Sequence, residues 1–519
     1  MATTGVRGFW AAAENEPDRV ALIDPADRHW TAGEILAGTN RLVHGLRARG
    51  VANGSRIATV LPNGPELVQV LLAAFQAGWH YTPVNPHLTA DETAYILGDA
   101  GVSAVVVHER FADRVVPAAQ QAGVPPGGRV SVGALPGFET MASLVDDQPT
   151  DLPAERAAGQ FMQYTSGTTG RPKAVVRDLL PMGPEAWVAA FAAPNLARYD
   201  ITPGGDDVHL VTSPMYHMAP LSLALFSLHF EHTLVVMEHW DAAEALRLIE
   251  RHRVTTTHMV PTQFHRLLQL PDGLRDRSDV SSLRSVMHAA APCPVDLKQQ
   301  LFDWWGPVIY EYYGATEGGG TLARPKEWLD HPGTVGRPWA GADVKILDDD
   351  GTELPPGRIG SVYLKLLGDF AYKDDLDKTA AGRVGGYFTV GDVGELDEEG
   401  FLYLRDRKID MIITGGVNVY PAEVEATLLT HPAVGDVAVF GVPDDEWGEQ
   451  VKAVVEPADG YDASPTLGDA LLEYAQARLA GYKRPRSIDF VDALPRDPNG
   501  KLPKGPLRDP YWAGRDRKI

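Results

Sequence analysis

The chain has 519 residues, of which 44% are hydrophobic and 22% are charged, a composition typical of globular proteins rather than disordered ones. This length predicts several domains, and the formal net charge of −22 argues against a general nucleic-acid binder, which needs a broad basic surface. The single cysteine, Cys293, excludes an intrachain disulfide, and no run approaches the ~18 apolar residues of a membrane span. The first ten residues lack the layout of a signal peptide. We therefore expect a cytoplasmic protein without integral membrane association.

Helical and strand patterns alternate through the first half of the chain. Apolar spacing and β-rich runs predict, in chain order, a helix at Glu34–Gly50, a strand at Arg56–Leu61, a helix at Pro65–Ala77, a strand at Tyr81–Val84, a helix at Ala90–Ala100 and a strand at Ala104–Val107. This alternation favours an α/β fold in which helices flank parallel or mixed sheets.

The pattern changes after about residue 339. Asp343–Leu347, Ile359–Leu366 and Gly394–Leu404 predict short strands in hairpins, which suggests a small β-barrel-like part. A smaller alternation then follows, with a helix at Pro421–Leu429, strands at Val434–Phe440 and Val451–Val455, and a helix at Leu467–Leu479. We predict a large N-terminal α/β domain at 1–406 and a small, mobile α+β domain at 407–519.

The segment YTSGTTGRPK at 164–173 combines glycines, hydroxyl groups and a cation. Exposed backbone N–H groups, hydroxyl donors and a lysine suit a polyphosphate, although the spacing is not that of an ordinary P-loop. By composition alone, such a loop is more often a plain surface turn.

This segment resembles the phosphate loop of the adenylate-forming enzymes, which include acyl-CoA synthetases, luciferases and peptide-synthetase adenylation domains. Further segments resemble motifs of that family in the same order: YGATE at 313–317, YFTVGD at 387–392, DR at 406–407 with GGVNVYPAEVE at 415–425, and PRDPNGK at 495–501. The resemblance covers nearly the whole chain and is greatest to bacterial fatty-acid and acyl-CoA synthetases. It implies a ligase that uses ATP, Mg²⁺ and coenzyme A.

Such a reaction requires charge neutralisation, because a carboxylate attacks the anionic α-phosphate of ATP. The resemblance implies that Glu317 and Thr168 hold Mg²⁺, a site of one carboxylate with substrate oxygens that suits this ion. The residues implied in nucleotide binding are Thr165, Ser166, Gly167, Thr168, Thr169, Gly170, Lys173, Ala289, Ala290, Glu311, Tyr312, Tyr313, Gly314, Asp392 and Arg407. Tyr313 offers a flat face for adenine, and Asp392 offers two acceptor oxygens for the ribose hydroxyls.

The resemblance also implies the catalytic groups. Lys501 would neutralise the charge that develops between the α-phosphate and the carboxylate, and the small domain would swing it away before thioester formation. Thr316, Glu317 and Arg407 would act beside it. His217 would stand between the carboxylate and the thiol channel, although a histidine packed at a helix start is the simpler alternative.

The resemblance implies fewer residues for the thiol channel and the acyl pocket. Gly415 and Gly416 would line the pantetheine channel, and Trp447 with a basic C-terminal tail would face coenzyme A. Gly318, Gly319 and Gly320 hint at extra pocket volume and hence at a medium-to-large fatty, aromatic or steroid-side-chain acid. Position 409, often charged in the family, is Ile409 here, with an unknown effect on the hinge. Cys293 fits a small apolar filler better than a nucleophile.

The leading hypothesis is an ATP-dependent carboxylate–CoA ligase that forms an acyl-adenylate and then a thioester. An alternative is an adenylate-forming enzyme with a different second partner. This partner would be a carrier-protein thiol, an amine, or nitrite that is activated as an AMP adduct for diazotisation. A non-catalytic nucleotide-binding relative is disfavoured, because the adenylation residues are retained. The identity of the acid and the oligomeric state, with a homodimer as one option, stay open.

Overall fold

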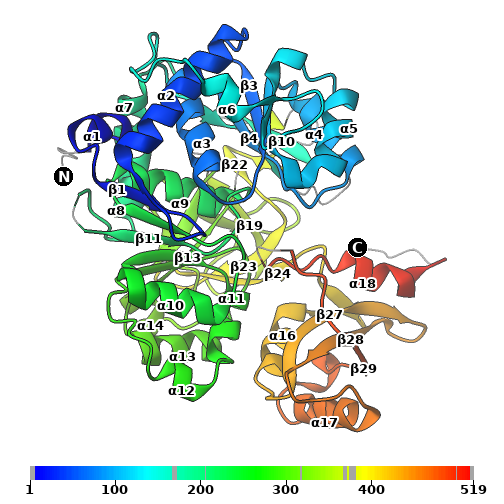
Figure 1. Cartoon of the computed structure of the whole chain (residues 1–519). Helices are drawn as coiled ribbons and strands as arrows, with labels where there is room; N and C mark the ends of the chain where they lie inside the picture. Colours follow the sequence, from blue (N-terminus) through cyan, green and yellow to red (C-terminus); the bar gives the residue numbers. More distant parts are fainter. Residues whose placement is uncertain are drawn as a thin grey trace. The chain divides into compact units, whose positions relative to one another are not determined.

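The computed structural model describes residues 6–165, 172–204, 206–315, 318–365, 371–372, 382–497 and 500–514 (Figure 1). It divides into two compact units. The first comprises Met1–Met259, Leu270–Met287 and Gly368–Ala381, and the second comprises Val260–Gln269, His288–Leu367 and Gly382–Ile519. None of the helices in the described ranges is long and apolar enough to cross a membrane.

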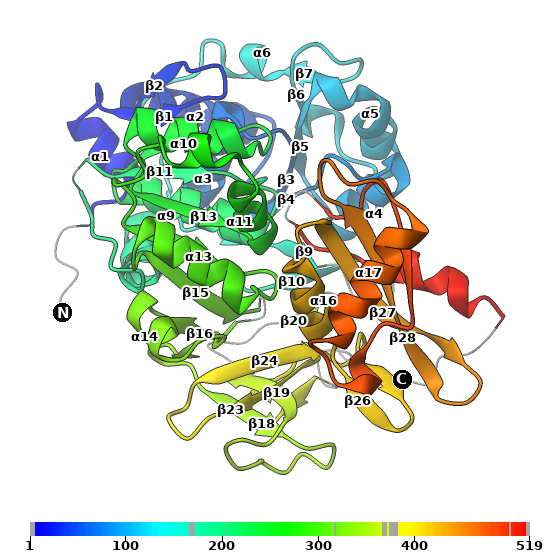
Figure 2. The ribbon, with the colours of Figure 1, turned by 90° about the horizontal axis from the view of Figure 1, so that it is seen from below.

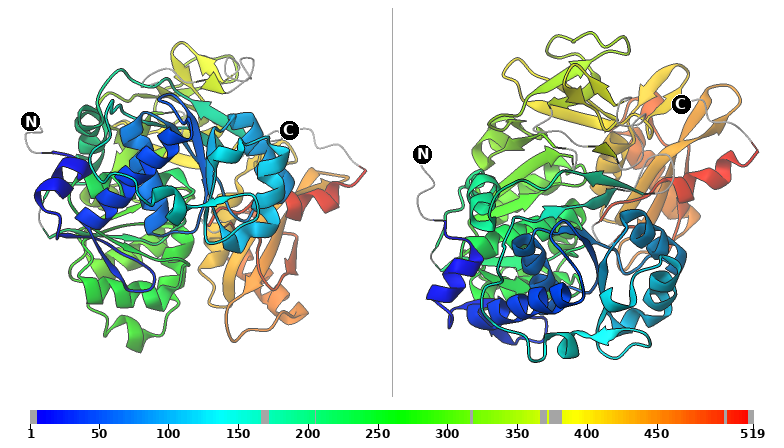
Figure 3. Two further views of the ribbon diagram at one scale, coloured as in Figure 1. Left: turned by 45° about the horizontal axis from the view of Figure 1, so that its top comes forward. Right: turned by 90° about the horizontal axis from the view of Figure 1, so that it is seen from above.

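A six-stranded parallel sheet in the first unit confirms the predicted alternation. Its strands follow the order β7-β6-β5-β3-β4-β8. They are β3 (Arg56–Val60), β4 (His80–Pro83), β5 (Ala104–His108), β6 (Arg129–Val132), β7 (Glu139–Thr140) and β8 (Gln160–Phe161). Helix α2 (Ala32–Ala48) precedes them, and α3 (Pro65–Ala77), α4 (Ala90–Ala100), α5 (Ala112–Gln121) and α6 (Met141–Val145) lie between them in sequence. Helices α4 and α5 lie side by side and share a hydrophobic core with β3 and β5 (Figure 3).

Local capping explains where these helices begin and end. The Thr31 hydroxyl accepts a hydrogen bond from the Glu34 amide and the Glu34 carboxylate accepts one from the Thr31 amide, so α2 begins two residues before its predicted start. Helix α3 has Pro65 in its first turn and ends at Gly78, whose φ of 69° is left-handed. Pro65–Ala77 and Ala90–Ala100 therefore match their predicted bounds.

The first unit also contains two further groups of strands. One group has the order β13-β11-β12-β1-β2 and is parallel except for the β1–β2 hairpin. Its strands are β1 (Val20–Ile23), β2 (His29–Thr31), β11 (Val208–Val211), β12 (Thr233–Val236) and β13 (Thr256–Met259), with helices α1 (Phe9–Asn15), α7 (Pro184–Trp187), α8 (Ala193–Ala197), α9 (Met218–His229), α10 (Ala242–His252) and α12 (Asp272–Arg275). The other is an antiparallel group, β9 (Gln163–Thr165), β10 (Lys173–Val176) and β20 (Ala371–Tyr372).

The second unit carries the predicted hairpins. An antiparallel ribbon has the order β17-β16-β15, and a six-stranded antiparallel sheet follows it in sequence. These elements are α11 (Pro261–Leu268), α13 (Val295–Trp305), β15 (Ile309–Gly314), β16 (Gly320–Ala323), α14 (Pro325–Asp330), β17 (Arg337–Pro338), β18 (Val344–Leu347), β19 (Gly360–Lys365), β21 (Arg383–Val384), β22 (Tyr387–Phe388), β23 (Asp392–Leu396) and β24 (Leu402–Arg407). The strand β14 (Ser285–His288) belongs to the first unit except for its last residue, His288, with which the segment His288–Leu367 of the second unit begins.

The predicted strand Gly394–Leu404 is wrong as a single element, because it contains a turn. Asp397 closes that turn, and β23 and β24 pair on either side of it. The register shifts between Val393 and Gly394, so one extra residue of β24 is accommodated as a bulge. Beyond the bulge, Asp392 lies directly opposite Arg407.

The last part of the second unit packs helices α16 and α17 beside the long hairpin β27–β28 (Figure 2). Its elements are β25 (Ile412–Thr414), β26 (Val417–Val419), α16 (Pro421–Leu429), β27 (Val434–Asp444), β28 (Gly448–Pro457), α17 (Pro465–Gln476), β29 (Ser487–Phe490) and α18 (Gly505–Arg508). The predicted helix at Pro421–Leu429 is confirmed, whereas the two strands are longer than predicted. The predicted boundary at 406/407 falls at the end of β24 and stays a prediction.

Candidate active site

Three predicted nucleotide residues meet at the ends of β15, β23 and β24. Tyr313 lies near the end of β15, and its Oη donates a hydrogen bond to Asp392 Oδ2 at 2.6 Å. Arg407, the last residue of β24, places its Nε 3.4 Å from Asp392 Oδ1. The side chain of Asp392 is largely buried, so a phenol and a guanidinium each engage one of its oxygens. The fold of the second unit therefore joins side chains that are 79 and 15 residues away from Asp392 in sequence.

Lys501 belongs to the same cluster. Partial burial and then the positive charge of Arg407 lower the pKa of its ammonium, while Asp497, Asp410 and Asp392 act in the opposite direction. The Lys501 ammonium is therefore within the electrostatic influence of both Arg407 and Asp392. The cluster thus carries two cations and an acceptor carboxylate, an arrangement that can bind an anion and a ribose-like diol.

Two of the predicted thiol-channel features also lie together. Gly415 has a φ of 57°, and its amide donates a hydrogen bond to the carbonyl of Trp447 at 2.8 Å. The Trp447 ring covers Gly415 so closely that a Cβ there would lie 2.5 Å from Cε3 of the indole. Trp447 nevertheless remains 52% exposed, so its free face is open to a ligand. Gly416, with a φ of 78°, has nothing within 4 Å of its Cβ direction.

The comparison with known proteins decides the family. Residues 9–368 match the family described as AMP-binding enzyme, and residues 423–501 match the AMP-binding enzyme C-terminal domain. The chain belongs to the AMP-binding enzyme family.

Relatives within this family agree on the class of reaction. The chain is 36% identical over 485 residues to feruloyl-CoA synthase of Amycolatopsis sp, covering 92% of this chain and 93% of the relative. It is 34% identical over 508 residues to long-chain-fatty-acid–CoA ligase FadD13 of Mycobacterium tuberculosis, with 96% of each covered, and 33% identical over 516 residues to fatty acid–[acyl-carrier-protein] ligase ScoC of Streptomyces coeruleorubidus, with 98% and 96% covered. The structure of the anthranilate CoA ligase AuaEII in complex with anthranoyl-AMP aligns with a TM-score of 0.86 at 26% identity, covering 99% and 98%. The predictions of the family, the α/β fold and an AMP-forming acid–thiol ligase are confirmed.

Several predicted residues of this AMP-binding enzyme lie outside the described residues. They are Ser166, Gly167, Thr168, Thr169, Gly170, Thr316 and Glu317. Their flanks are described: Lys173 opens β10 and pairs with Thr165, the last residue of β9, in the first unit. Both residues predicted to hold Mg²⁺ are therefore outside this part. Within the described ranges, no group of three or more His, Cys, Asp or Glu side chains is placed to hold a metal ion.

His217 belongs to the first unit and precedes α9 as its N-cap residue. Its ring lies 4.4 Å from that of Tyr216, measured between centroids. This is the geometry of a histidine packed at a helix start, and the predicted role between carboxylate and thiol stays a prediction.

Glu311, predicted to bind the nucleotide, instead points into the protein. Its Oε2 lies 2.6 Å from Lys298 Nζ and 3.4 Å from His288 Nε2, and Lys298 is fully buried. Burial alone would raise the pKa of Glu311, but the neighbouring Lys298 and His288 hold it well below its usual range. The Glu311 carboxylate therefore serves a buried ion pair, and the predicted role of Glu311 in nucleotide binding stays a prediction. Cys293 lies near the same group, where burial and Glu311 raise the pKa of its thiol, which suits a filler rather than a nucleophile.

Sequence reasoning missed Lys298 and His288, although the signal was present for the lysine. Lys298 occupies the buried stripe of α13, three, four and seven residues before the buried positions Leu301, Phe302 and Trp305. A charged residue on such a stripe predicts a buried partner. His288 is the last residue of β14, just before Ala289 and Ala290, whose small side chains were predicted beside adenine. Ala290 has a φ of 76°, a strained conformation for a residue other than glycine.

Tyr312 and Gly314 flank Tyr313 on β15, and the extra volume expected from the neighbouring glycines is filled by protein. A Cβ at Gly320 would lie 2.3 Å from the Trp339 ring, and one at Gly319 would lie 2.7 Å from the Lys365 carbonyl oxygen. Gly319 permits close packing against β19, and Gly320 permits close packing against Trp339 and β15, so these two glycines give no evidence for a large acyl pocket.

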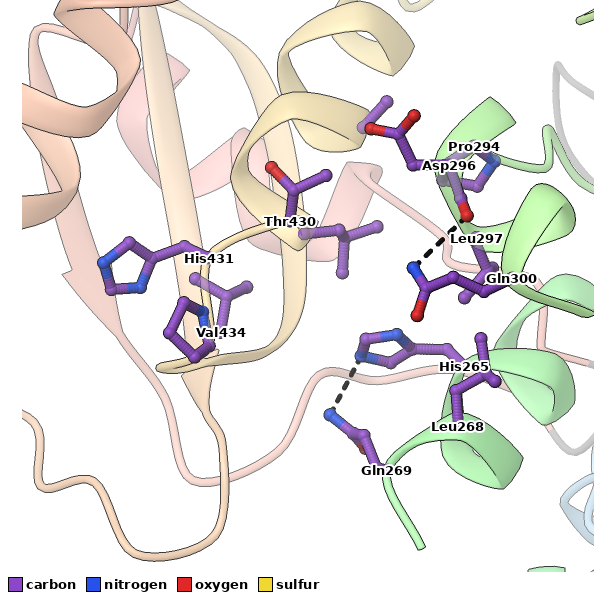
Figure 4. A pocket seen from close by; sticks show the side chains of 13 residues that line it. His265, Leu268, Gln269, Pro294, Asp296, Leu297, Gln300, Thr430, His431 and Val434 are labelled. Carbon is purple, nitrogen blue, oxygen red and sulfur yellow. Dashed lines mark hydrogen bonds between the residues drawn. The ribbon is translucent and has the colours of Figure 1, made fainter. Parts of the chain in front are cut away.

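A pocket of about 490 Å³ lies elsewhere in the second unit (Figure 4). Helices α11 and α13 line it on one side and the end of α16 on the other, with His265 and His431 among its side chains. None of the predicted site residues lines it, so it is distinct from the Asp392 cluster.

Proposed function

We propose that this AMP-binding enzyme is an ATP-dependent acyl-CoA ligase. In the first step, an oxygen of a carboxylate attacks the α-phosphate of ATP, the bond to the β-phosphate breaks, and pyrophosphate leaves. In the second step, the thiol of coenzyme A attacks the carbonyl carbon of the acyl-adenylate, and AMP leaves. The observation that carries the proposal is the cluster of Tyr313, Asp392, Arg407 and Lys501.

Each member of the cluster has a task in the first step. Asp392 accepts hydrogen bonds from the ribose hydroxyls while Tyr313 holds its other oxygen and packs against adenine. Arg407 and Lys501 supply positive charge at the α-phosphate, where two anions meet. Pre-placed charges of this kind contribute most of such a rate acceleration, since they need no reorganisation during the reaction. Mg²⁺, held by Glu317 and Thr168 as the sequence predicts, would neutralise the phosphates.

Coenzyme A is proposed as the acyl acceptor because of two residues in the small domain. Trp447 presents an exposed indole over Gly415, which suits a narrow pantetheine arm sliding past a flat wall. Fatty and aromatic acids are the substrate classes that the names of FadD13 and feruloyl-CoA synthase suggest. A carrier-protein thiol is the second candidate acceptor, favoured by the similarity to ScoC, because a carrier presents the same pantetheine arm.

The experiment is turnover of purified protein with Mg²⁺-ATP and octanoate, palmitate, ferulate or cholate, with products followed by mass spectrometry. Each acid is run alone, with coenzyme A, and with a phosphopantetheinylated carrier protein. We expect AMP, pyrophosphate and a CoA thioester with at least one acid. A thioester only on the carrier would select the second acceptor, and adenylate without any thioester would direct attention to amines and nitrite.

A lysine variant ties this activity to the cluster. Lys501→Ala should lower pyrophosphate release by about 10²–10³-fold, the usual loss when one preorganised charge is removed. Lys326→Met is the matched control, since Lys326 is an exposed lysine on α14. Equal rates in Lys501→Ala and the control would contradict the proposal.

A further inference from the structure

The loop that carries Lys501 has an internal scaffold. The Asp497 amide donates a hydrogen bond to the Lys501 carbonyl at 2.9 Å, and the Gly500 amide donates one to the Asp497 carbonyl at 2.8 Å. The Lys501 amide in turn donates to Asp497 Oδ1 at 2.9 Å. The backbone of Lys501 is thus held against Asp497, and the position of its ammonium depends on what holds this turn to the rest of the chain.

Arg496 provides one attachment. Its Nη1 donates a hydrogen bond to the Gly500 carbonyl at 2.7 Å, directly before Lys501. Its other donors engage Asp436 on β27: Nη2 donates to Oδ1 at 2.7 Å, and Nε donates to Oδ2. Both side chains are largely buried, at 19% and 12% exposed. One guanidinium therefore joins the Lys501 turn to the central hairpin of the small domain.

The other side of the turn rests on α11. Gly500 has a φ of 78°, and a Cβ there would lie 3.0 Å from Thr262 Oγ1 and 3.1 Å from Val260 Cγ2. His265, one turn further along α11, contacts the Gly435 carbonyl through Nε2 at 3.0 Å, next to Asp436; Figure 4 shows this histidine at the edge of the pocket. Gly500, directly before Lys501, is therefore held between the start of α11 and the Arg496–Asp436 pair.

We propose that Arg496 and Asp436 are positioning residues for adenylation, acting through the Gly500 carbonyl to set the place of the Lys501 ammonium. The inference rests on the proposed function of Lys501. It assigns a role to Arg496, which belongs to the segment PRDPNGK but is not one of the residues proposed to act on the substrates. An arginine is required because its planar fork binds a carboxylate with two donors and still has a third for a carbonyl, whereas a lysine ammonium offers no such geometry.

The proposal predicts different effects on the two half-reactions. A displacement of about 1 Å in a catalytic group can lower a rate ~10²-fold. Arg496→Lys and Asp436→Asn should therefore lower acid-dependent ATP–pyrophosphate exchange by about 10–100-fold. Thioester formation from a supplied acyl-adenylate, which does not need Lys501 in this mechanism, should stay within about twofold of the unmodified protein. The acids are octanoate, palmitate, ferulate and cholate, together with their synthetic adenylates.

The matched control is Asp489→Asn. Asp489 also accepts an ion pair in the small domain, from Lys452 at 2.8 Å, and a hydrogen bond from Tyr511, and neither partner belongs to the Lys501 turn. Both half-reactions should be unchanged in this variant. Equal losses in the two half-reactions of Arg496→Lys and Asp436→Asn would indicate general damage to the domain and would overturn the positioning role, as would the absence of any loss.

A second readout separates this inference from the function itself. Hydrogen exchange followed by mass spectrometry reports directly on the amides of Gly500 and Lys501, which donate within the turn. Exchange in the peptide around 496–504 should accelerate in Arg496→Lys and Asp436→Asn but not in Asp489→Asn. If the unmodified protein adenylates none of the acids, the proposed function fails, and unchanged exchange in the variants would independently overturn the anchoring by Arg496.

Discussion

The phenol of Tyr313 donates a hydrogen bond of 2.6 Å to the carboxylate of Asp392, joining the end of β15 to the start of β23. A carboxylate that is fixed in this way keeps its remaining acceptor sites in one orientation. Binding of a ribose diol then requires no rearrangement of the acid, so the hydrogen bond acts on nucleotide affinity rather than on the chemical step.

Tyr313→Phe tests this relationship. The change removes one hydrogen bond to a charged group, a contribution of about 1.5–3 kcal/mol, and retains the ring. We expect the KM for ATP to rise by about tenfold with little change in kcat, measured by pyrophosphate release. Tyr403→Phe is the matched control, because Tyr403 Oη approaches Asp397 on the same hairpin at 3.4 Å. An unchanged KM in Tyr313→Phe would show that Asp392 needs no such support.

The charge of Arg407 should set the alkaline limit of adenylation. Partial burial and then Arg407 lower the pKa of Lys501, and the reaction uses the protonated ammonium. The rate should therefore fall as pH rises through this lowered pKa. Arg407→Met removes a positive neighbour, which raises the pKa of Lys501 and moves the fall to higher pH, in addition to lowering the overall rate. The measurement is the pH profile of pyrophosphate release.

Two further variants test whether the shift in the pH profile comes from the charge at position 407. Arg407→Lys retains the positive charge and should leave the alkaline limb in place. Arg405→Met removes a nearby arginine that pairs with Glu395 and should also leave it in place. Identical limbs in Arg407→Met and the unmodified protein would mean that another group governs the profile.

Gly415→Ala should impair thioester formation and spare adenylation, which is the reverse of the effect expected for Arg496→Lys. A Cβ at this position would lie 2.5 Å from the Trp447 ring, so the indole must move. We expect thioester formation from a supplied adenylate to fall by about tenfold or more, with ATP–pyrophosphate exchange within about twofold. Gly460→Ala is the control for backbone strain alone, since Gly460 has a φ of 88° but nothing within 4 Å. Equal behaviour of the two variants would assign any loss to strain.

The Lys298–Glu311 pair should contribute strongly to the free energy of unfolding. Lys298→Met leaves a buried carboxylate beside a methionine, and breaking a buried pair in this way lowers the free energy of unfolding by about 3–5 kcal/mol. Glu311→Gln added to Lys298→Met should recover part of the loss, because no uncompensated charge remains. Denaturant titrations measure both effects. Lys345→Met, which breaks an exposed pair with Glu353, should change the midpoint far less.

How far the sequence predicts this molecule depends on the kind of signal. Strand–helix alternation and the caps at Thr31 and Gly78 are local, so the three helices predicted in the first unit, α2, α3 and α4, lie close to their predicted bounds. The Asp392 cluster was predictable as a set, because each member belongs to a motif of fixed order. The turn at Asp397 was missed, since apolar residues on both sides of it continue one β-like pattern.

Long-range pairings explain the remaining differences. Glu311 lies in the same motif as Tyr313, and the motif alone does not show that Lys298 occupies its carboxylate. The volume left by Gly319 and Gly320 could be judged only once Trp339 was placed beside them. In both cases the partner is distant in sequence and belongs to no motif.

The bulge in the β23–β24 hairpin determines the sign of the charge that faces Asp392. If β24 kept the register that pairs Gly394 with Leu404 and formed no bulge, Asp406 would lie opposite Asp392, and two like charges would oppose each other. A single-residue insertion between 404 and 406, with the one-residue bulge kept, would therefore bring Asp406 opposite Asp392 and replace attraction by repulsion at this position. The turn around Asp397 lies beyond the last strand pair and can vary in length while the two strands keep their register. Tolerance to insertions and deletions should thus change sharply within fewer than ten residues of one hairpin.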